Sequence, residues 1–424
     1  MECGIINVML FCKGDSLMAK NSNLTRAKNA KNDEFYTQSA DIENELKYYR
    51  PHFKDKIVYL NCDDPTTSNF WRYFYRSFEF LGLKKLISTH YNMDGSSSYA
   101  LIYEGGHDNA DNFDEGVVKV LLKGNGDFRS DECIEYLKQS DVVVTNPMFS
   151  LFREYVALLM KYHKQFLIWG NQNAITYKEF FPLLMNRQVW IGNLANKTCV
   201  FRIPDDYKKW DKKETEKHND GHHYAKVPAI TTFTNMSLNK STDQTVLWKK
   251  FNQDEYPAYD NYAAFEVSKV ADIPVDTEIE AEIASENLDG WKKTYGDDLV
   301  VLDDDGKVAK VKINRPVWGT PITMLDKYNP QSTVRQHNLA KDFEILGMSK
   351  GLGFNEINNI QTIKKYIHAI QWSQDAKQSN GSKLNTGANI SYDTIPSKGK
   401  YYTADNAKGY LHQTYGRVFI RKKK

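Results

Sequence analysis

The chain has few cysteines, and their spacing fits neither a zinc site nor a disulfide scaffold. Five cysteines are scattered through 424 residues without a C-x-x-C pair. Such a set is typical of a protein in a reducing compartment, so we expect a cytoplasmic location. His218, His222 and His223 lie close together, but no cysteine or carboxylate accompanies them at ligand spacing. We therefore expect no metal site.

Long apolar runs and an excess of one charge are also missing. No run of about 18 apolar residues occurs, so we expect no membrane span. Lysine and arginine number 56 and aspartate and glutamate 54, which gives a net charge of +2. This balance excludes a histone-like polycation, but it permits a local basic face that could contact nucleic acid.

Residues 1–28 are predicted to form a basic, flexible N-terminal arm. The apolar patch GIINVMLFC lacks the layout of a signal peptide, and Met18 begins a more typical hydrophilic start. We expect residues 1–17 to come from an over-long reading frame and to be poorly ordered. The basic residues that follow form either a solvated arm or an arm that contacts phosphates.

From residue 56 onward, apolar runs alternate with helical patterns. The alternation predicts an α/β fold with a largely parallel sheet covered on both faces. The runs predicted as strands are 56–60, 83–89, 117–128, 141–146 and 165–171. The helical patterns are 68–82, 130–140, 149–163 and 176–186.

Capping residues mark several of these helices. Gly82 is placed to close the first helix, and Ser130 is a predicted N-cap followed by acidic residues. Thr176 and Glu179 have the spacing of a capping box.

The second half of the chain has a different character. DLVVLDDDGKVAKVKI predicts a β-hairpin with an Asp-Gly turn inside an insertion at about 277–313. Short strands are predicted at 189–193, 198–204 and 230–236, and another at RVFIRKKK near residue 420. Residues 373–400 are rich in Ser, Asn, Gly and Lys and are predicted to be flexible loops. YPAYDNYAAF is either a Tyr-rich core segment or part of a target-reading surface.

Polar side chains follow several predicted strands at their carboxyl ends. They are Asp63, Asp64, Asp127, Asn146 and Asn171. Ligands of parallel sheets bind beyond this edge, so the sequence predicts a site there.

The stretch DVVVTNPMFSLFREY places a polar corner after one of these strands. The Asn146 amide oxygen and the Pro147 carbonyl could accept both hydrogens of an exocyclic amine. Phe149 could stack on the ring that carries this amine. Adenine and cytosine carry such amines, and in a duplex the base must first be flipped out. The alternative is a plain β-to-α corner with an Asx-type turn.

Ten ordered segments resemble the EcoRI-type family of adenine-specific DNA methyltransferases. Among them are NAKNDEFYTQ, VYLNCDDPTTSNFWRYF, GDFRS, VVTNPMFSLFREY and GTPITMLDKYNP. The resemblance is dense from residue 29 to about 180, patchy to about 346 and thin beyond. It implies a Rossmann-like sheet, S-adenosylmethionine as cofactor and methyl transfer to adenine N6 within a short site of double-stranded DNA.

The resemblance also assigns residues. Asn146, Pro147 and Phe149 match the catalytic Asn-Pro-Pro-Phe tetrapeptide of the family. Cofactor-binding residues are matched in three places, namely Phe35, Tyr36 and Thr37; Asp63, Asp64 and Pro65; and Asp127 and Phe128. The last pair matches the segment beside the cofactor's adenine, whereas the Asp63–Pro65 loop lacks the glycine-rich form common in other methyltransferases.

One position departs from the family pattern. The family has a second proline where this chain has Met148, which relaxes the restriction on Pro147. Both acceptors remain, so we expect an active enzyme, although a slower one. The other readings are a DNA-binding relative without activity and a methyltransferase for another substrate, such as cytosine N4 or protein glutamine.

The expected organisation follows from the resemblance. Residues 29–240 are predicted to be the catalytic domain and residues 241–424 the target-recognition region. We expect a monomer on DNA, with a restriction endonuclease for the same site as its candidate partner. The recognition sequence stays open. Arg129 and Arg153 either contact DNA beside the pocket or form surface ion pairs.

Overall fold

A computed structural model describes most of the chain. The described residues are 36–62, 64–92, 95, 97–107, 113–203, 215–218, 220–238, 247–328, 339–349, 352–357, 368–370, 376–378, 388–392, 401–403, 410–414 and 416–424. The expectations for residues 1–28, Phe35 and Asp63 lie outside this part of the chain.

The first lobe is built on a large sheet, called sheet A here, whose centre is parallel. Its four central strands lie in the order β2 (Lys85–Thr89), β1 (Ile57–Asn61), β5 (Val142–Thr145) and β6 (Gln165–Asn171). Tyr59 is in register with Ile87 on one side and with Val143 on the other. The predicted α/β fold with a largely parallel, Rossmann-like sheet is confirmed.

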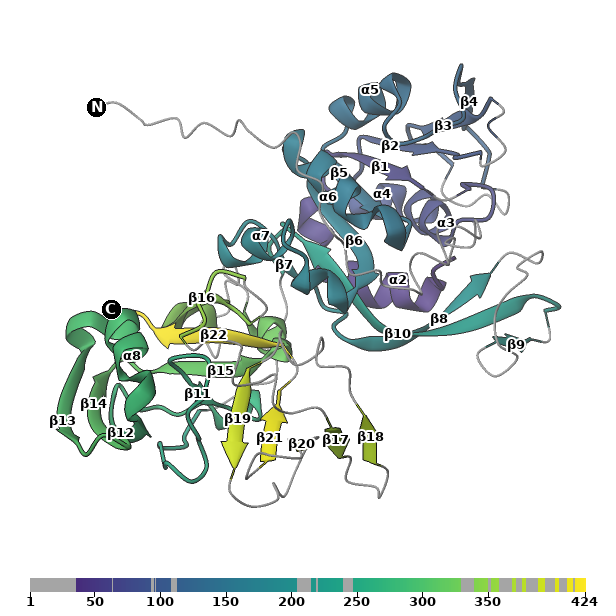
Figure 1. The fold of residues 1–424 in the computed structure, drawn as a ribbon. Coiled ribbons are helices and arrows are strands. Elements are labelled where there is room, and N and C mark those ends of the chain that lie inside the picture. Colours follow the sequence, from purple (N-terminus) through teal and green to yellow (C-terminus); the bar gives the residue numbers. More distant parts are fainter. Residues whose placement is uncertain are drawn as a thin grey trace, which may run out of the picture.

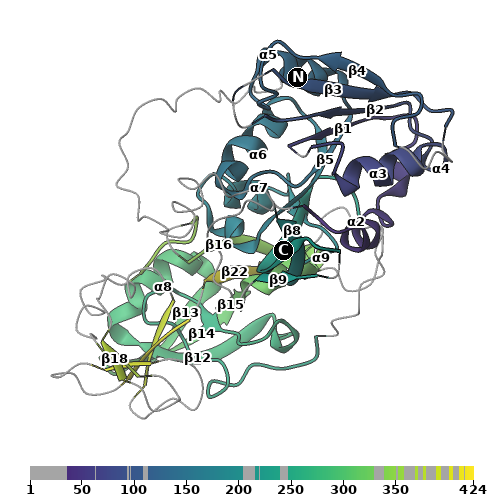
Figure 2. The ribbon, with the colours of Figure 1, turned by 90° about the vertical axis from the view of Figure 1, so that its right-hand side faces the viewer.

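Helices cover both faces of sheet A (Figures 1 and 2). Alternate residues of each strand point to opposite faces, so Val58 packs in one buried cluster and Tyr59 in the other. The helices against the Val58 face are α2 (Ser39–Leu46), α3 (Asn69–Arg76) and α4 (Phe78–Leu81). Those against the Tyr59 face are α5 (Asp131–Gln139), α6 (Phe152–Lys161) and α7 (Phe181–Met185).

The edges of sheet A are antiparallel. One edge is formed by β3 (Tyr99–Tyr103) and β4 (Val118–Leu121). The other is formed by β10 (His223–Thr234), with β7 (Trp190–Ile191), β8 (Lys197–Ile203) and β9 (Thr215–Lys217) paired to it. In Figure 1 the ribbon of β8, β9 and the start of β10 projects beyond the sheet.

The strand predicted at 117–128 is shorter than expected. It ends at Leu121, and β3, which the sequence did not reveal, separates it from the parallel strands. Gly126 adopts φ 79°, which breaks the extended backbone before Asp127. Asp127 therefore lies in a loop before α5 and not at the end of a strand.

Two of the predicted helix ends are confirmed and one is wrong. Gly82 closes α4 in the left-handed conformation, and the Ser130 hydroxyl accepts from the backbone N–H of Cys133. The capping box at Thr176 and Glu179 does not form, because the Thr176 hydroxyl donates to the Asn173 carbonyl at 2.8 Å. This bond closes a 3-10 turn, and the α-helix begins only at Phe181.

The second lobe contains three smaller sheets. Sheet B has the order β11 (Phe265–Glu266), β15 (Val317–Pro321), β22 (Arg417–Lys422) and β16 (Phe343–Met348). Sheet C has the order β12 (Glu278–Ala284), β14 (Val308–Asn314) and β13 (Leu299–Asp304), with α8 (Leu288–Tyr295) inserted after β12. The hairpin predicted from DLVVLDDDGKVAKVKI is confirmed as β13 and β14, with Gly306 at φ 82° in the turn.

Sheet D and short helices complete this lobe. Sheet D has the order β18 (Ala376–Gln378), β17 (His368–Ile370), β20 (Tyr401–Thr403), β21 (Tyr410–Gln413) and β19 (Asn389–Tyr392). Two of these strands lie in the stretch predicted as loops, because short polar strands carry little apolar periodicity. The helix α9 (Leu339–Asp342) precedes β16. The 3-10 helices of the chain are η1 (Arg50–His52), η2 (Phe149–Leu151), η3 (Gln172–Thr176), η4 (Val270–Asp272), η5 (Ser285–Asn287), η6 (Gly296–Asp298) and η7 (Ile322–Lys327).

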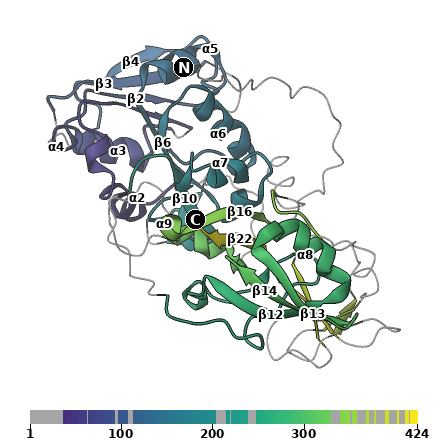
Figure 3. The same cartoon turned by 90° about the vertical axis from the view of Figure 1, so that its left-hand side faces the viewer.

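The two lobes share one buried core. The cluster on the Tyr59 face of sheet A continues into Trp318 and Phe419 of sheet B. Figures 1 and 3 show α7 beside β16 at this junction. Tyr256, Tyr259 and Tyr262 are buried in the same core, which confirms the core reading of the Tyr-rich segment.

Two features are absent from the described part of the chain. None of its helices is long and apolar enough to cross a membrane. None of its His, Cys, Asp and Glu side chains form a group of three or more that could hold a metal ion.

Candidate active site

A cleft opens where β1, β2 and β5 end. It holds about 370 Å³ of space, part of it open to solvent. The residues that line it are Cys62, Tyr91, Gly126, Asp127, Phe128, Pro147, Met148 and Leu151. The structure thus brings together Pro147, Asp127 and Phe128, which the sequence placed in the site from two separate motifs.

The Asn-Pro corner stands at one wall of this cleft. All four residues of β5 are buried, and Asn146, which follows them, is only 6% exposed. Pro147 and Met148 come next and line the cleft. Phe149 begins η2 and packs against the buried cluster on the Val58 face, so it does not share the wall formed by Pro147 and Met148.

A buried amide beneath the cleft fixes its floor. Asn61, the last residue of β1, accepts the Tyr155 hydroxyl at its side-chain oxygen and the Thr145 hydroxyl at its carbonyl. Tyr155 meets Phe128 edge to face, with ring centroids 5.1 Å apart. Burial raises the pKa of Tyr155 well above its ordinary value, so its hydroxyl keeps the proton that it donates. Asn61 ties β1, β5 and α6 together directly below Cys62 and Phe128.

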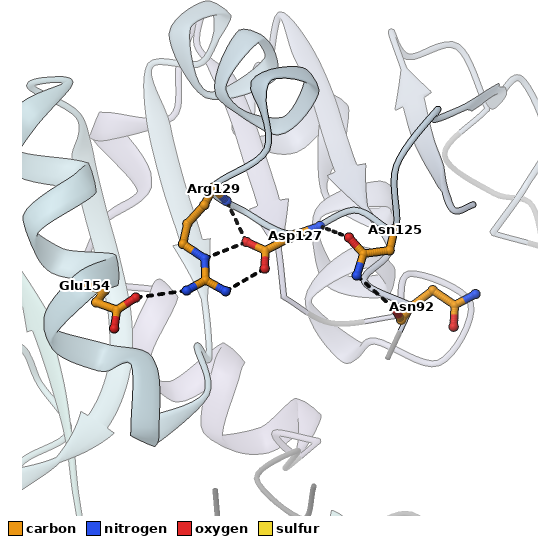
Figure 4. Close-up of polar contacts among 5 residues, drawn as sticks. All are labelled: Asn92, Asn125, Asp127, Arg129 and Glu154. Carbon is orange, nitrogen blue, oxygen red and sulfur yellow. Dashed lines mark hydrogen bonds and ion pairs between the residues drawn. The ribbon is translucent and has the colours of Figure 1, made fainter. Parts of the chain in front are cut away.

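The opposite wall is held by ion pairs around Asp127. Arg129 donates from its backbone N–H and from Nε to Asp127 Oδ1, each at 2.9 Å, and from Nη2 to Oδ2 at 2.7 Å. Arg129 Nη1 also donates to Glu154 Oε2 at 3.0 Å (Figure 4). These bonds lower the pKa of Asp127 below its usual range, so the group in the cleft is a carboxylate.

The other residues that the resemblance assigned lie outside the lining of the cleft. Asp64 Oδ1 accepts from the Thr66 backbone and hydroxyl, at 2.9 and 2.8 Å, and from the Tyr99 hydroxyl at 3.1 Å. These bonds make a turn in which Pro65 is buried. At least one carboxylate oxygen of Asp64 therefore stabilises this turn by accepting hydrogen bonds.

The segment before α2 docks near the start of α3. Tyr36 pairs with Arg202 of β8 through two backbone hydrogen bonds of 3.0 and 3.2 Å. The Thr37 carbonyl accepts from Asn69 Nδ2 at 2.7 Å. Thr37 is 2% exposed, and its hydroxyl oxygen has no hydrogen-bond partner in the described part of the chain.

The two arginines expected beside the pocket both form exposed ion pairs. Arg129 pairs with Asp127 and Glu154. Arg153 pairs with Glu179 at 3.6 Å and lies over the Tyr177 ring, 5.4 Å from its centroid. Of the two readings given for these residues, the ion pairs are the one that the structure contains.

Sequence reasoning missed four of the residues that shape the site. Cys62 and Gly126 adjoin predicted residues, and the positive φ of 93° at Cys62 occurs where glycine is usual. No sequence motif pointed to Tyr91 or Asn61. A polar residue directly after the buried apolar run of β1 is the signal that could have indicated Asn61.

Comparison with known proteins places the chain in a family. Residues 23–290 match the family model described as adenine-specific methyltransferase EcoRI. Type II methyltransferase M.EcoRI of Escherichia coli is 39% identical over 352 residues, which cover 80% of this chain and 93% of that protein. No solved structure matched the chain.

Two mycoplasma proteins are also similar. Type II methyltransferase M.MpnI of Mycoplasma pneumoniae is 42% identical over 81% of this chain and 96% of its own length. Type II methyltransferase M.MgeORF184P of Mycoplasma genitalium is 32% identical over 82% of this chain and 98% of its own length. The activity expected from the sequence, DNA adenine methylation in a restriction–modification context, is therefore confirmed at the level of the family. The chain belongs to the EcoRI-type family of adenine-specific DNA methyltransferases.

Proposed function

We propose that this enzyme methylates the N6 atom of an adenine flipped out of a short DNA site, with S-adenosylmethionine as the methyl donor. One observation carries the proposal. Pro147, which follows the buried Asn146 at the end of a central strand, shares a cleft with the Asp127 carboxylate and the Phe128 ring. One amine acceptor and a purine-binding wall therefore lie in the same cleft, with the second acceptor on the residue directly before Pro147, as methyl transfer between two adenine-bearing partners requires.

Three features of the chain fit the proposed cofactor. Asp127 presents a carboxylate that can accept from the amino group of adenine, and Phe128 offers a ring beside it. Gly126 adds no side chain to the lining. The buried Thr37 hydroxyl offers a donor and acceptor near the loop after β1. S-adenosylmethionine, when bound, supplies an electrophilic methyl group.

The catalytic corner would act on the amine of the target base. The Asn146 side-chain oxygen and the Pro147 carbonyl accept its two hydrogens, which directs the nitrogen lone pair away from the ring plane and toward the incoming methyl group. Phe149 would stack on the flipped base. Because Asn146 is almost fully buried, its bonds to the amine form in a low-dielectric site, where hydrogen bonds are stronger than in water.

The remaining roles are proposed at the level of domains and partners. Residues 29–240 would form the catalytic domain, because they contain sheet A and the cleft. Residues 241–424, with sheets B, C and D, would read the target sequence. We further propose a cytoplasmic enzyme that acts as a monomer on DNA and protects the site of a cognate restriction endonuclease.

The test is methyl transfer to DNA with identification of the product base. The protein is incubated with labelled S-adenosylmethionine and unmethylated plasmid, and the digested nucleosides are analysed by mass spectrometry. N6-methyladenine supports the proposal. N4-methylcytosine, or the absence of any transfer, overturns it.

Replacement of Met148 by proline is expected to speed the reaction. Met148 has φ −51° and ψ 124°, within the range that proline adopts, so the substitution fits the backbone. A proline that fits the backbone reduces the number of unfolded and alternative conformations, which is worth about 0.4–1 kcal/mol. If this restriction acts on the corner, it corresponds to about a two- to fivefold higher rate. Single-turnover rates of Met148→Pro and the parent measure this difference. Met148→Leu, which changes the side chain alone, is the control, and a slower Met148→Pro enzyme would contradict the prediction.

Replacement of Gly126 by alanine is expected to weaken cofactor binding by about tenfold or more. A Cβ at Gly126 would lie 1.8 Å from the His90 carbonyl oxygen, so the backbone before Asp127 must move. Displacements of about 1 Å in a binding site can cost about 100-fold. Calorimetric titration with S-adenosylhomocysteine gives the affinity. Gly124→Ala is the matched control, because its Cβ would meet only Glu132 Oε2 at 3.6 Å. Equal affinities for both variants would refute the prediction.

A further inference from the structure

Arg129 uses most of the acceptor capacity of Asp127. A carboxylate has about four acceptor positions, two on each oxygen. Asp127 Oδ1 receives two bonds from Arg129, from the backbone N–H and from Nε, whereas Oδ2 receives only one, from Nη2. Within the described part of the chain, one acceptor position is therefore left, and it belongs to Oδ2. Because Asp127 lines the cleft, this position is the one with which it can bind a ligand.

Asp127 is held in place at its backbone on one side and at its carboxylate on the other, as Figure 4 shows. The Asp127 backbone N–H donates to Asn125 Oδ1 at 3.3 Å, and Asn125 Nδ2 donates to the Asn92 carbonyl at 3.3 Å. On the other side, Arg129 reaches Glu154 in the first turn of α6. That helix follows the catalytic corner after the short η2, so the chain of contacts connects the loop after β2 to the helix next to the corner.

We propose that Arg129 is a positioning residue that directs Asp127 Oδ2 toward the exocyclic amine of the cofactor's adenine. The proposal rests on the proposed function, because it assigns a role within the same cofactor site. The fork of the guanidinium fixes the plane of the carboxylate, and its charge keeps the carboxylate an acceptor. Arg129 and Glu154 are both exposed, and exposed ion pairs contribute little to stability. Arg129 thus contributes more to the orientation of the Asp127 carboxylate than to the stability of the fold.

The inference is tested with two ligands that differ at one group. S-adenosylhomocysteine carries the amine, whereas S-inosylhomocysteine has a carbonyl there and cannot donate to Asp127 from that position. Calorimetric titrations without DNA give the ratio of their affinities. For the parent we expect a preference of about tenfold or more for the adenosyl compound, because a site built to accept from an amine rejects an analogue that lacks it.

The variants measure how much of that preference depends on Arg129. Arg129→Met is expected to reduce the preference by about fivefold or more, and Arg129→Lys, which keeps the charge but not the fork, to reduce it by a smaller factor. Asp127→Ala should abolish it. Arg153→Met is the matched control, because Arg153 is a similarly exposed arginine on α6 with its own acidic partner. Its preference should equal that of the parent.

Each result either supports or overturns the positioning role of Arg129. An unchanged preference in Arg129→Met and Arg129→Lys, with melting temperatures like the parent's, overturns the positioning role and leaves the proposed function intact. Binding of neither ligand by the parent overturns the proposed cofactor and the role of Arg129 together. Should Arg129→Met fail to fold, Arg129→Lys alone still reports, because it preserves the charge between Asp127 and Glu154.

Discussion

Replacement of Asn146 by alanine is expected to lower the rate of methyl transfer by about 10²–10³-fold. The variant loses one of the two acceptors that we propose orient the target amine. Removal of a single preorganised hydrogen-bonding group from an active site has costs of this size. Asn146 does not line the cleft that holds the proposed cofactor contacts, so the affinity for S-adenosylhomocysteine should stay within about twofold of the parent's. Single-turnover methyl transfer and calorimetry measure the two quantities.

The controls separate chemistry from folding. Asn252→Ala changes an exposed asparagine in the second half of the chain whose side chain caps a turn at Asp254, and its rate should match the parent's. The melting temperature of Asn146→Ala shows whether the buried corner still packs. A variant that keeps the parent's transfer rate would remove Asn146 from the mechanism, and one that loses cofactor binding to the same extent would assign it a structural role.

Replacement of Arg417 by methionine is expected to reduce the free energy of unfolding by about 3–5 kcal/mol. The Arg417 and Glu266 side chains are 13% and 7% exposed, and they form two hydrogen bonds of 3.0 and 2.6 Å between β22 and β11. The Tyr259 hydroxyl also donates to Glu266. Removal of the arginine leaves a buried carboxylate without its countercharge, and loss of one partner of a buried pair has a cost in this range. Urea unfolding followed by tryptophan fluorescence provides the measurement.

The same strand provides a matched control. Arg421 of β22 pairs with Glu344 of β16, but these side chains are 20% and 37% exposed. Arg421→Met should cost about 0–1 kcal/mol, because solvent screens the pair and hydrates the remaining carboxylate. Equal losses for the two variants would mean that burial does not govern these ion pairs. The double variant Arg417→Met with Glu266→Gln, which leaves no buried charge of the pair, should cost less than Arg417→Met alone.

The centre of the first lobe was predictable from sequence because its strands are buried on both faces. The apolar runs of β1, β5 and β6 are bounded by helix caps and polar residues. The sequence therefore indicates both that these strands exist and where they lie. The edge of the sheet was not predictable in the same way. Val118 and Leu121 of β4 are exposed, so an apolar run there indicated a buried strand that does not exist. The glycine-containing turn at residues 123–126, which follows β4, carries no periodic signal either.

The site was predictable where a motif names the chemistry. Asn146, Pro147, Asp127 and Phe128 each carried such a motif, and the structure brings the last three to one cleft. The supports of the site could not be read from the sequence. Whether Arg129 pairs with its second neighbour Asp127 or reaches outward depends on the position of Glu154 on another element. Tertiary arrangement decides such contacts, and a single sequence contains no record of it.

The position of β22 at the centre of sheet B also governs the order in which the protein can fold during synthesis. The strands of sheet A all precede residue 235, so the first lobe can pair as soon as they have emerged. Glu266 and Arg417, in contrast, are 151 residues apart in the chain. Until β22 emerges, β15 and β16 lack the strand that lies between them, and Glu266 lacks its countercharge. Closure over such distances is slow, so a nascent chain would acquire the proposed cofactor cleft first and the complete second lobe, the proposed reader of the target, last.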